Sequence, residues 1–303
     1  MSASASVVPL RFQVGARTLW SIPRRLHRVG LTLDQALAGK LAKLPPLSPS
    51  DHGYLLTSIP EKMLEQALSA HLSSFVRQRY VRSYADLSIG YEKWLSGLSG
   101  NARSTLRRKQ KKLAQHPDRM EITSFRTPEE MAVFHALARP VAAATYQEKL
   151  LGAGLPDTPA FVERMGALAA EDRARAWLMR LGGRPIAYLW CSAEGDTLRY
   201  DYVGHHPAWS ELSPGTVLHA AAFEELFREG RFARFDFTEG EGQHKRQFAT
   251  DGVACADLLL LRDTVSNRAA MAALEAFDAG VAIAKRAAAR PALAGLARRV
   301  RRA

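Results

Sequence analysis

The first chemically suggestive feature is a strand that ends in glycine and leads into the start of a helix. Tyr202-Val203-Gly204 is typical of a strand end, and Ser213-Pro214-Gly215-Thr216-Val217 of a first helical turn, with Ser213 as N-cap. Backbone N–H groups in a first turn lack partners within the helix, and the helix dipole favours an anion there. The segment is suited to a phosphate or pyrophosphate, although many such helix starts bind nothing.

A second candidate is a glycine-spaced acidic loop. Asp236 stands between Phe235 and Phe237 at a predicted strand end, and Glu241 and Lys245 follow it. A carboxylate and an amine at one mouth of a sheet can transfer protons or stabilise charge. Alternatively, Asp236 caps the loop and Lys245 pairs with an acid; the spacing favours neither reading.

Other reactive side chains show no pattern of a site. The histidines do not have the spacing of metal ligands, so we expect surface or loop histidines and no metal; they include His27, His52, His205, His206 and His219. Ser213 lacks the G-x-S-x-G context of a nucleophile. Cys191 and Cys255 lie in apolar strand-like segments and are expected to be reduced thiols in the core, with one disulfide as the alternative.

Composition narrows the class of protein. The chain has 303 residues, 47% of them hydrophobic and 24% charged, and a mean hydropathy of -0.18. These values are typical of globular domains and argue against disordered, collagen-like or coiled-coil chains. We expect no membrane-spanning segment and no export signal, and therefore a cytoplasmic protein.

The net charge of +12 is concentrated in three segments, residues 11–43, 99–119 and 263–303. The rest of the chain is mildly acidic, which argues against a continuous groove for a phosphate backbone. In the predicted helix Asn101–Gln115, a narrow apolar stripe is surrounded by Arg103, Arg107, Arg108, Lys109, Lys111 and Lys112. This face is either a platform for an anionic partner or a solvated surface.

Periodicity and turn residues predict an alternation of strands and helices after residue 50. Strands are predicted at 54–59, 75–87, 120–125, 174–181, 185–193, 197–204, 232–237 and 252–262, and helices at 61–73, 101–115, from 128 past 137, 159–170 and 214–229.

The tail is expected to dock as an amphipathic helix through Leu274, Phe277 and Val281, with peripheral membrane contact as the alternative.

The order of these pieces resembles the GNAT-superfamily acyltransferases of the FemAB-like branch, often labelled cellulose-biosynthesis-type N-acetyltransferases. The resemblance runs from about Tyr91 to Arg262, a little over half of the chain. The matching pieces are Asn101–Leu113, Thr145–Gln147, Gly183–Ala187, Tyr202–Gly204, Ser213–Gly215, and Asp236-Phe237 with Gly240, Lys245 and Phe248.

The resemblance implies an α/β (α+β) fold of the GNAT acyl-CoA N-acyltransferase type. Its sheet is mixed and mostly antiparallel, with helices on both faces. We expect four segments: a basic N-terminal segment at 1–50, a smaller GNAT-like α/β portion at 51–119, the acyltransferase domain at 120–262, and a basic helical tail at 263–303.

The resemblance also implies a reaction, in which an amine attacks the thioester of acetyl-CoA or another acyl-CoA directly. The acceptor is a small-molecule, glycan or peptide amine. Val203 and Gly204 would lie along the pantetheine, with the Val203 amide toward the thioester carbonyl, and Ser213, Pro214, Gly215, Thr216 and Val217 would form the pyrophosphate turn.

For the chemistry itself we expect Lys245 to stabilise charge or to contact an acceptor phosphate. We expect Asp236 or Glu241 to act as base and Tyr202 as acid. Tyr146 and Gln147 are candidates for the acceptor side, although Tyr146 is also explained as a packed aromatic side chain.

One departure from the family pattern keeps two alternatives open. The Glu211–Thr216 stretch has a single glycine where acetyl-CoA loops usually have more. A FemAB-like transferase that uses aminoacyl-tRNA is therefore the first alternative. The second is a non-catalytic GNAT-like module that binds a polyanion or a membrane surface through the basic segments.

Overall fold

The computed structural model describes residues 5–14, 17–41, 43–68, 71–145, 154–240 and 242–288, which form two compact units. The first combines Met1–Arg79 with Cys255–Ala303, and the second is Tyr80–Ala254. The division differs from the four predicted segments because strands β4 (Leu72–Asp86) and β10 (Asp251–Arg262) each contribute residues to both units. A boundary inside a regular strand leaves no compositional signal.

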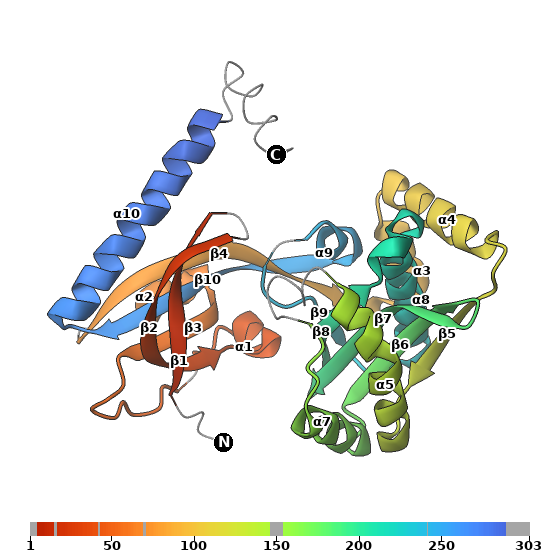
Figure 1. The fold of residues 1–303 in the computed structure, drawn as a ribbon, viewed down its shortest axis with the longest axis horizontal. Coiled ribbons are helices and arrows are strands. Elements are labelled where there is room, and N and C mark those ends of the chain that lie inside the picture. The colour runs from red at the N-terminus through yellow and green to blue at the C-terminus, as the bar shows by residue number, and fades with distance from the viewer. Residues whose placement is uncertain are drawn as a thin grey trace. The chain divides into compact units, whose positions relative to one another are not determined.

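The first unit is built on strands from both ends of the chain (Figure 1). β1 (Ser6–Val14) and β2 (Arg17–Gly30) form an antiparallel hairpin. β2 pairs in parallel with β3 (Gly53–Pro60), and β3 pairs antiparallel with β10. The helices of this unit are α1 (Leu33–Ala38), η1 (Glu61–Met63), α2 (Leu64–Ala67) and α10 (Val265–Ala288).

Helix α10 packs on this sheet through an apolar stripe, as the sequence predicted for the tail. Leu274 is fully buried, and Phe277 packs beside it against the cluster that contains Leu10 and Phe12. The part of the predicted tail from residue 289 onward lies outside the described residues.

Two local predictions in this unit differ from the structure. Residues 6–38, expected only as a basic segment, contain β1, β2 and α1. Their alternation is hidden because both strands carry prolines and arginines and the register shifts after Phe12. The helix predicted at 61–73 ends at Ala67, because β4 already begins at Leu72.

The second unit holds the rest of the fold. Its strands follow the order β4-β9-β8-β7-β6-β5, in which only the β8–β9 pair is parallel, so the mixed and mostly antiparallel sheet is confirmed. Besides β4, this unit contains β5 (Met120–Phe125), β6 (Ala174–Leu181), β7 (Arg184–Glu194), β8 (Thr197–His205) and β9 (Arg234–Asp236). The helices are η2 (Leu87–Ile89), α3 (Tyr91–Gly97), α4 (Gly100–Ala114), α5 (Pro128–Ala144), α7 (Pro159–Ala170), η3 (Pro207–Leu212), α8 (Pro214–Glu229) and α9 (Gln243–Phe248).

Helices cover both faces of this sheet, as the fold class requires (Figure 1). On one face α3, α4 and α8 bury the larger core, in which Trp94, Leu106 and Phe223 are buried. On the other face α5 and α7 bury a second core around Phe134 and Met165. Since each sheet face needs apolar cover, the alternating side chains of β6, β7 and β8 serve one core or the other.

A β-bulge interrupts this alternation in β8. Trp190 pairs with Tyr202 and Cys191 with Tyr200, so Asp201 is the extra residue. Its carboxylate accepts hydrogen bonds from the Ser192 backbone N–H (2.8 Å) and hydroxyl and from Arg199 Nε (2.7 Å). The bulge therefore sends Tyr200 into the core under α8 and Tyr202 toward α5 and α7.

The parallel pair of β8 and β9 is short. Its register comprises Thr197 with Arg234, Leu198 with Phe235, and Arg199 with Asp236. β8 continues to His205, whereas β9 ends at Asp236. The pairing thus stops one residue before Tyr200, at the bulge.

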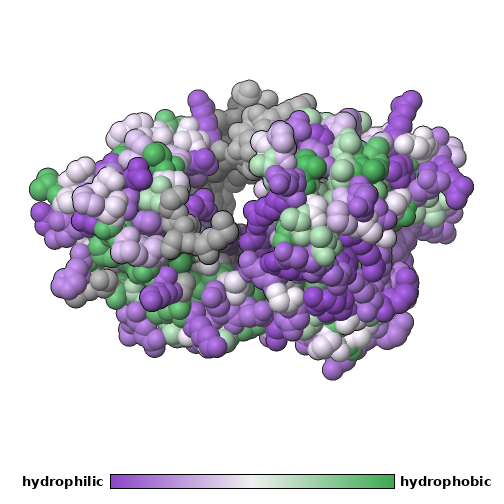
Figure 2. Space-filling view, turned by 90° about the horizontal axis from the view of Figure 1, so that it is seen from below, coloured by the Kyte–Doolittle hydropathy of each residue, from purple (hydrophilic) through white to green (hydrophobic). Residues whose placement is uncertain are grey.

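On the face shown in Figure 2, the surface carries mainly polar side chains, and hydrophobic residues form smaller separate patches. In the part of the chain that the structure describes, no helix is long and apolar enough to cross a membrane. Cys191 and Cys255 are buried and reduced, as predicted.

The bulge yields a stability prediction. Asp201→Ala leaves the buried Ser192 N–H without its acceptor, which costs about 1–3 kcal/mol of unfolding free energy in urea denaturation. The matched control is Asp196→Ala, at a carboxylate that is 56% exposed and 3.8 Å from Arg234, with a change within about 0.5 kcal/mol. Equal stability of the two variants would contradict a structural role for Asp201.

Candidate functional site

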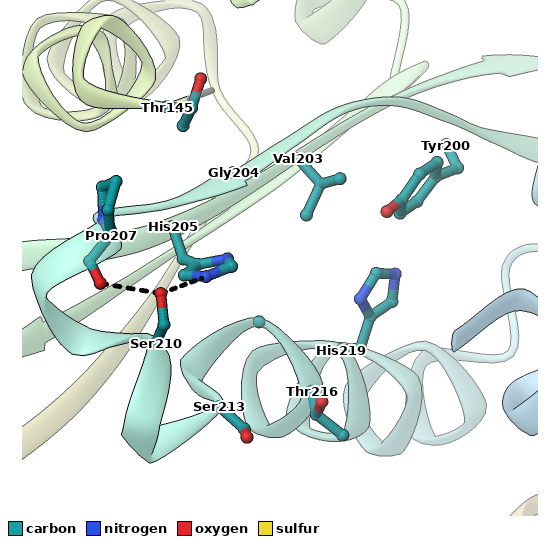
Figure 3. Close-up of a pocket in the computed structure, with 11 residues that line it drawn as sticks. Thr145, Tyr200, Val203, Gly204, His205, Pro207, Ser210, Ser213, Thr216 and His219 are labelled. Carbon is teal, nitrogen blue, oxygen red and sulfur yellow. Dashed lines mark hydrogen bonds between the residues drawn. The ribbon is translucent and has the colours of Figure 1, made fainter. Parts of the chain in front are cut away.

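A cavity of about 530 Å³ opens between β8 and α8 in the second unit. It begins where the pairing of β8 with β9 ends, and side chains from the strand and the helix face each other across it (Figure 3). Its lining residues are Thr145, Tyr200, Val203, Gly204, His205, Pro207, Ser210, Ser213, Gly215, Thr216 and His219.

The first turn of α8 forms the outer end of the cavity. Ser213 is the N-cap in the left-handed conformation (φ 52°), but its side chain makes no capping hydrogen bond. A Cβ atom on Gly215 would stand 3.8 Å from His205 Nδ1, so this glycine leaves room in the cavity. Five of the predicted donor-binding residues line the cavity: Val203, Gly204, Ser213, Gly215 and Thr216. The other two, Pro214 and Val217, are buried residues in the first turn of α8.

The basic helix α4 supplies positive charge to the same end. Lys109 Nζ donates to Thr216 Oγ1 at 3.1 Å, and Lys112 Nζ donates to the Glu211 carbonyl at 2.9 Å. Burial lowers the pKa of Lys109, and the neighbouring charge of Arg108 lowers it further. Arg103 has a structural role, because it donates to the carbonyls of Ser96 and Leu98.

The inner end is aromatic and contains a histidine. His219 is 3% exposed and projects from the second turn of α8 toward β8, between Val203 and Tyr200 (Figure 3). Its ring stacks on Tyr200 at 5.0 Å and on Phe248 at 5.7 Å between centroids. Burial raises the pKa of Tyr200 far above its usual value, so this phenol stays neutral.

A second histidine marks the rim. His205 Nε2 lies 3.3 Å from Ser210 Oγ, and that hydroxyl donates to the Pro207 carbonyl. Burial lowers the pKa of His205, and the adjacent His206 lowers it further, so the imidazole is neutral at pH 7. An anion bound at the helix start would favour its protonated form.

Gly204 is required by close packing behind the cavity. A Cβ atom there would lie 2.6 Å from Tyr188 Cε1 and 3.0 Å from Thr145 Cγ2. Thr145 ends helix α5, where its hydroxyl donates to the Ala142 carbonyl. The strand end, α5 and the cavity wall are therefore held in contact.

Asp236 and Lys245 form a different cluster. Asp236 is buried and makes a two-point ion pair with Arg82, with Nη2–Oδ2 at 2.6 Å and Nε–Oδ1 at 3.1 Å. Burial would lower the pKa of Arg82, but the hydrogen bond and charge of Asp236 raise it overall. Lys245 Nζ donates to the Glu239 carbonyl at 2.6 Å, and burial lowers its pKa.

This cluster supports the cavity rather than lining it. Among the residues that the structure describes, neither Asp236 nor Lys245 belongs to the cavity wall. They adjoin the chain segments of Phe237 and Phe248, whose rings lie 6.4 and 5.7 Å from His219. The catalytic roles assigned to them from the sequence stay predictions.

The remaining predicted residues are placed elsewhere or lie outside the description. Tyr202 packs against Phe161 and Trp190, on the sheet face away from His219. Tyr146, Gln147 and Glu241 lie outside the described residues, although Thr145, next to Tyr146, lines the cavity.

Sequence reasoning missed His219, Tyr200 and His205. A usable signal existed for His219, since it follows Gly215 by four residues and so shares its helix face. Tyr200 had no such signal. In a regular strand its side chain would lie on the same face as that of Tyr202, but the bulge at Asp201 places the two on opposite faces of the sheet. Within the described residues, no three or more His, Cys, Asp or Glu side chains are grouped as metal ligands.

Residues 100–246 match the family model described as an acetyltransferase (GNAT) domain. This range contains α4, the bulge, the whole cavity wall and Lys245. No curated protein matches the sequence.

Solved structures show a similar fold at low sequence identity. The C-terminal domain of a putative lysylphosphatidylglycerol synthetase from Agrobacterium fabrum is 12% identical, with a TM-score of 0.51 over 75% of this chain and 71% of that chain. FemX is 10% identical, with a TM-score of 0.49 over 86% and 89% of the two chains. A GCN5-related N-acetyltransferase from Kribbella flavida is 14% identical, with a TM-score of 0.39 over 71% and 69%. At 12% identity the likeness to the Agrobacterium fabrum domain concerns the fold alone.

The ion pair of Asp236 gives a test that separates a structural from a catalytic role. Asp236→Asn removes the carboxylate that pairs with the buried Arg82 guanidinium, so the unfolding free energy falls by about 3–5 kcal/mol. Glu224→Gln, in an exposed pair with Arg228, is the control and changes stability by less than about 0.5 kcal/mol. If Asp236→Asn kept the stability of the natural protein but lost turnover, the result would support Asp236 as the catalytic base.

Proposed function

Since the chain is an acyltransferase that contains a GNAT acetyltransferase domain, we propose that it transfers an acyl group from acyl-CoA, with acetyl-CoA as the first candidate, to an amine. The observation that carries this proposal is the cavity between β8 and the first turn of α8, with a lysine of α4 at its outer end. A CoA donor also fits the cytoplasmic location that the sequence predicts.

The outer end suits the phosphates of the donor. The first-turn amides of α8 and the helix dipole favour an anion, and Gly215 leaves space for it. Lys109 lies at hydrogen-bond distance from Thr216, so its amine is placed to contact a bound phosphate. Beside the single glycine of this turn, Ser213 takes the left-handed conformation (φ 52°) that glycine favours, which supports a tight turn at this position.

The inner end suits the reacting thioester. A pantetheine that follows β8 from the helix start passes Gly204 and Val203 and reaches Tyr200 and His219. There the amine nitrogen attacks the thioester carbonyl carbon, the carbon–sulfur bond breaks, and CoA leaves as the thiol. The neutral Tyr200 hydroxyl is a hydrogen-bond donor or acceptor, but its raised pKa makes it a poor proton source.

His219 is the proton carrier in this proposal. It accepts the proton that the amine loses on attack and returns it to the leaving thiolate, so that charges balance over one turnover. An imidazole suits both steps near neutral pH. Stacking on Tyr200 and Phe248 holds the ring toward β8.

Donor binding is tested by calorimetric titration with CoA and acetyl-CoA. We expect micromolar binding to the natural protein, and a loss of at least tenfold in Gly215→Glu, which fills the space beside His205 and repels phosphate. Gly215→Gln is the matched control of equal size without the charge, and it should bind CoA more tightly than Gly215→Glu.

Two results would count against acyl-CoA as donor. Equal affinities of the Glu and Gln variants for CoA would show that no phosphate of the donor binds at this turn. Absence of binding by a folded natural protein would direct the search to aminoacyl-tRNA, the alternative from the sequence.

Proton transfer is tested by removing the imidazole. His219→Gln should lower kcat by about 10²-fold or more, because the amine proton then lacks its acceptor. The affinity for CoA should stay within about threefold, because the phosphate end is unchanged. His116→Gln, at a histidine outside the cavity, is the control for loss of an imidazole.

If His219→Gln kept kcat within about threefold of the natural protein, His219 would only shape the cavity. Proton transfer would then have to be assigned to another group.

A further inference from the structure

The turn end of the β1–β2 hairpin exposes large apolar side chains. Val14 is 46%, Leu19 55% and Trp20 60% exposed. All three lie within three ladder positions of the turn, where Val14 pairs with Arg17 and Phe12 with Trp20. We call Val14, Leu19 and Trp20, with Arg11 and Arg17, the hairpin tip.

The exposure follows from the register of the hairpin. Trp20 lies opposite Phe12, on the same face, at 4.9 Å between ring centroids. Phe12 is buried, partly by Phe277 of α10 at 5.3 Å, whereas Trp20 extends the same apolar face beyond that cover. The register shift leaves Leu19 as the extra, unpaired residue of β2.

The hairpin carries charge of one sign only. The stretch from Ser6 to Gly30 contains five arginines and no Asp or Glu. Two of them are engaged inside the unit, Arg24 with Asn267 and Arg25 with Asp51. Arg11 and Arg17, at the tip, are exposed.

We propose that the hairpin tip binds an anionic lipid surface. Trp and Leu side chains favour the boundary between headgroups and acyl chains, and arginines beside them attract anionic headgroups. A nucleic acid would use the arginines but would gain nothing from exposed Leu19 and Val14. This inference uses only the first unit and does not rest on the proposed acyl transfer.

The test is co-sedimentation of the full chain with vesicles. We expect binding to vesicles of phosphatidylglycerol and phosphatidylcholine, weakening as salt is raised, and little binding to pure phosphatidylcholine. Trp20 is far more exposed than the buried Trp94, Trp177 and Trp190, so its emission should shift to the blue on binding.

Variants separate the two contributions. Leu19→Ser with Trp20→Ser should weaken vesicle binding at least tenfold and abolish the blue shift. Arg11→Gln with Arg17→Gln should weaken it about 25-fold, since each arginine near an anionic surface contributes roughly a factor of five. The control is Val133→Ser with Arg228→Gln, at an exposed valine and an exposed arginine of the second unit, and it should bind as the natural protein does.

Any of three outcomes would overturn the proposal. The first is absence of binding to phosphatidylglycerol vesicles by the natural protein, and the second is binding that Leu19→Ser with Trp20→Ser leaves unchanged. The third is retention on tRNA or heparin that depends on Arg11 and Arg17 but not on Leu19 and Trp20, together with no blue shift on vesicles. Circular dichroism of each variant confirms that these surface changes leave the fold intact.

Discussion

The cavity depends on one constraint, the early end of the pairing between β8 and β9. After Arg199 and Asp236 the two strands no longer pair, and the bulge at Asp201 occupies that point. The Asp201 carboxylate replaces the backbone acceptor that Ser192 loses, so the irregularity is satisfied rather than strained. Because of it, Tyr200 faces α8 while Tyr202 fills the core on the opposite sheet face.

Helix α8 connects the two ends of the proposed reaction. Its first turn presents Gly215 beside the lysine of α4, and its second turn presents His219 beside Tyr200. One rigid element therefore fixes the separation between the anion end and the aromatic end. The Arg82–Asp236 pair and Lys245 stabilise the adjoining segments of Phe237 and Phe248, which pack behind His219.

Local signals in the sequence were sufficient for much of the second unit. The limits of β5 and β6, the Thr127 capping box of α5 and the Pro214 start of α8 follow from alternation, capping and proline, which act over a few residues. Long-range features were not predictable. Nothing local shows that Lys109 meets Thr216, that β10 returns the chain to the first unit, or that Asp201 is an extra residue. The catalytic assignments depended on such contacts, and so His219 and Tyr200 were missed.

The central claim is that a CoA donor lies along β8 with its phosphates on the first turn of α8. A crystal structure with desulfo-CoA, which cannot react, tests it most directly. The account predicts the pyrophosphate at the amides of Gly215 and Thr216, with Lys109 nearby, and the pantetheine running past Val203 toward His219. A ligand bound outside this cavity, or with its phosphates at the His219 end, would contradict it.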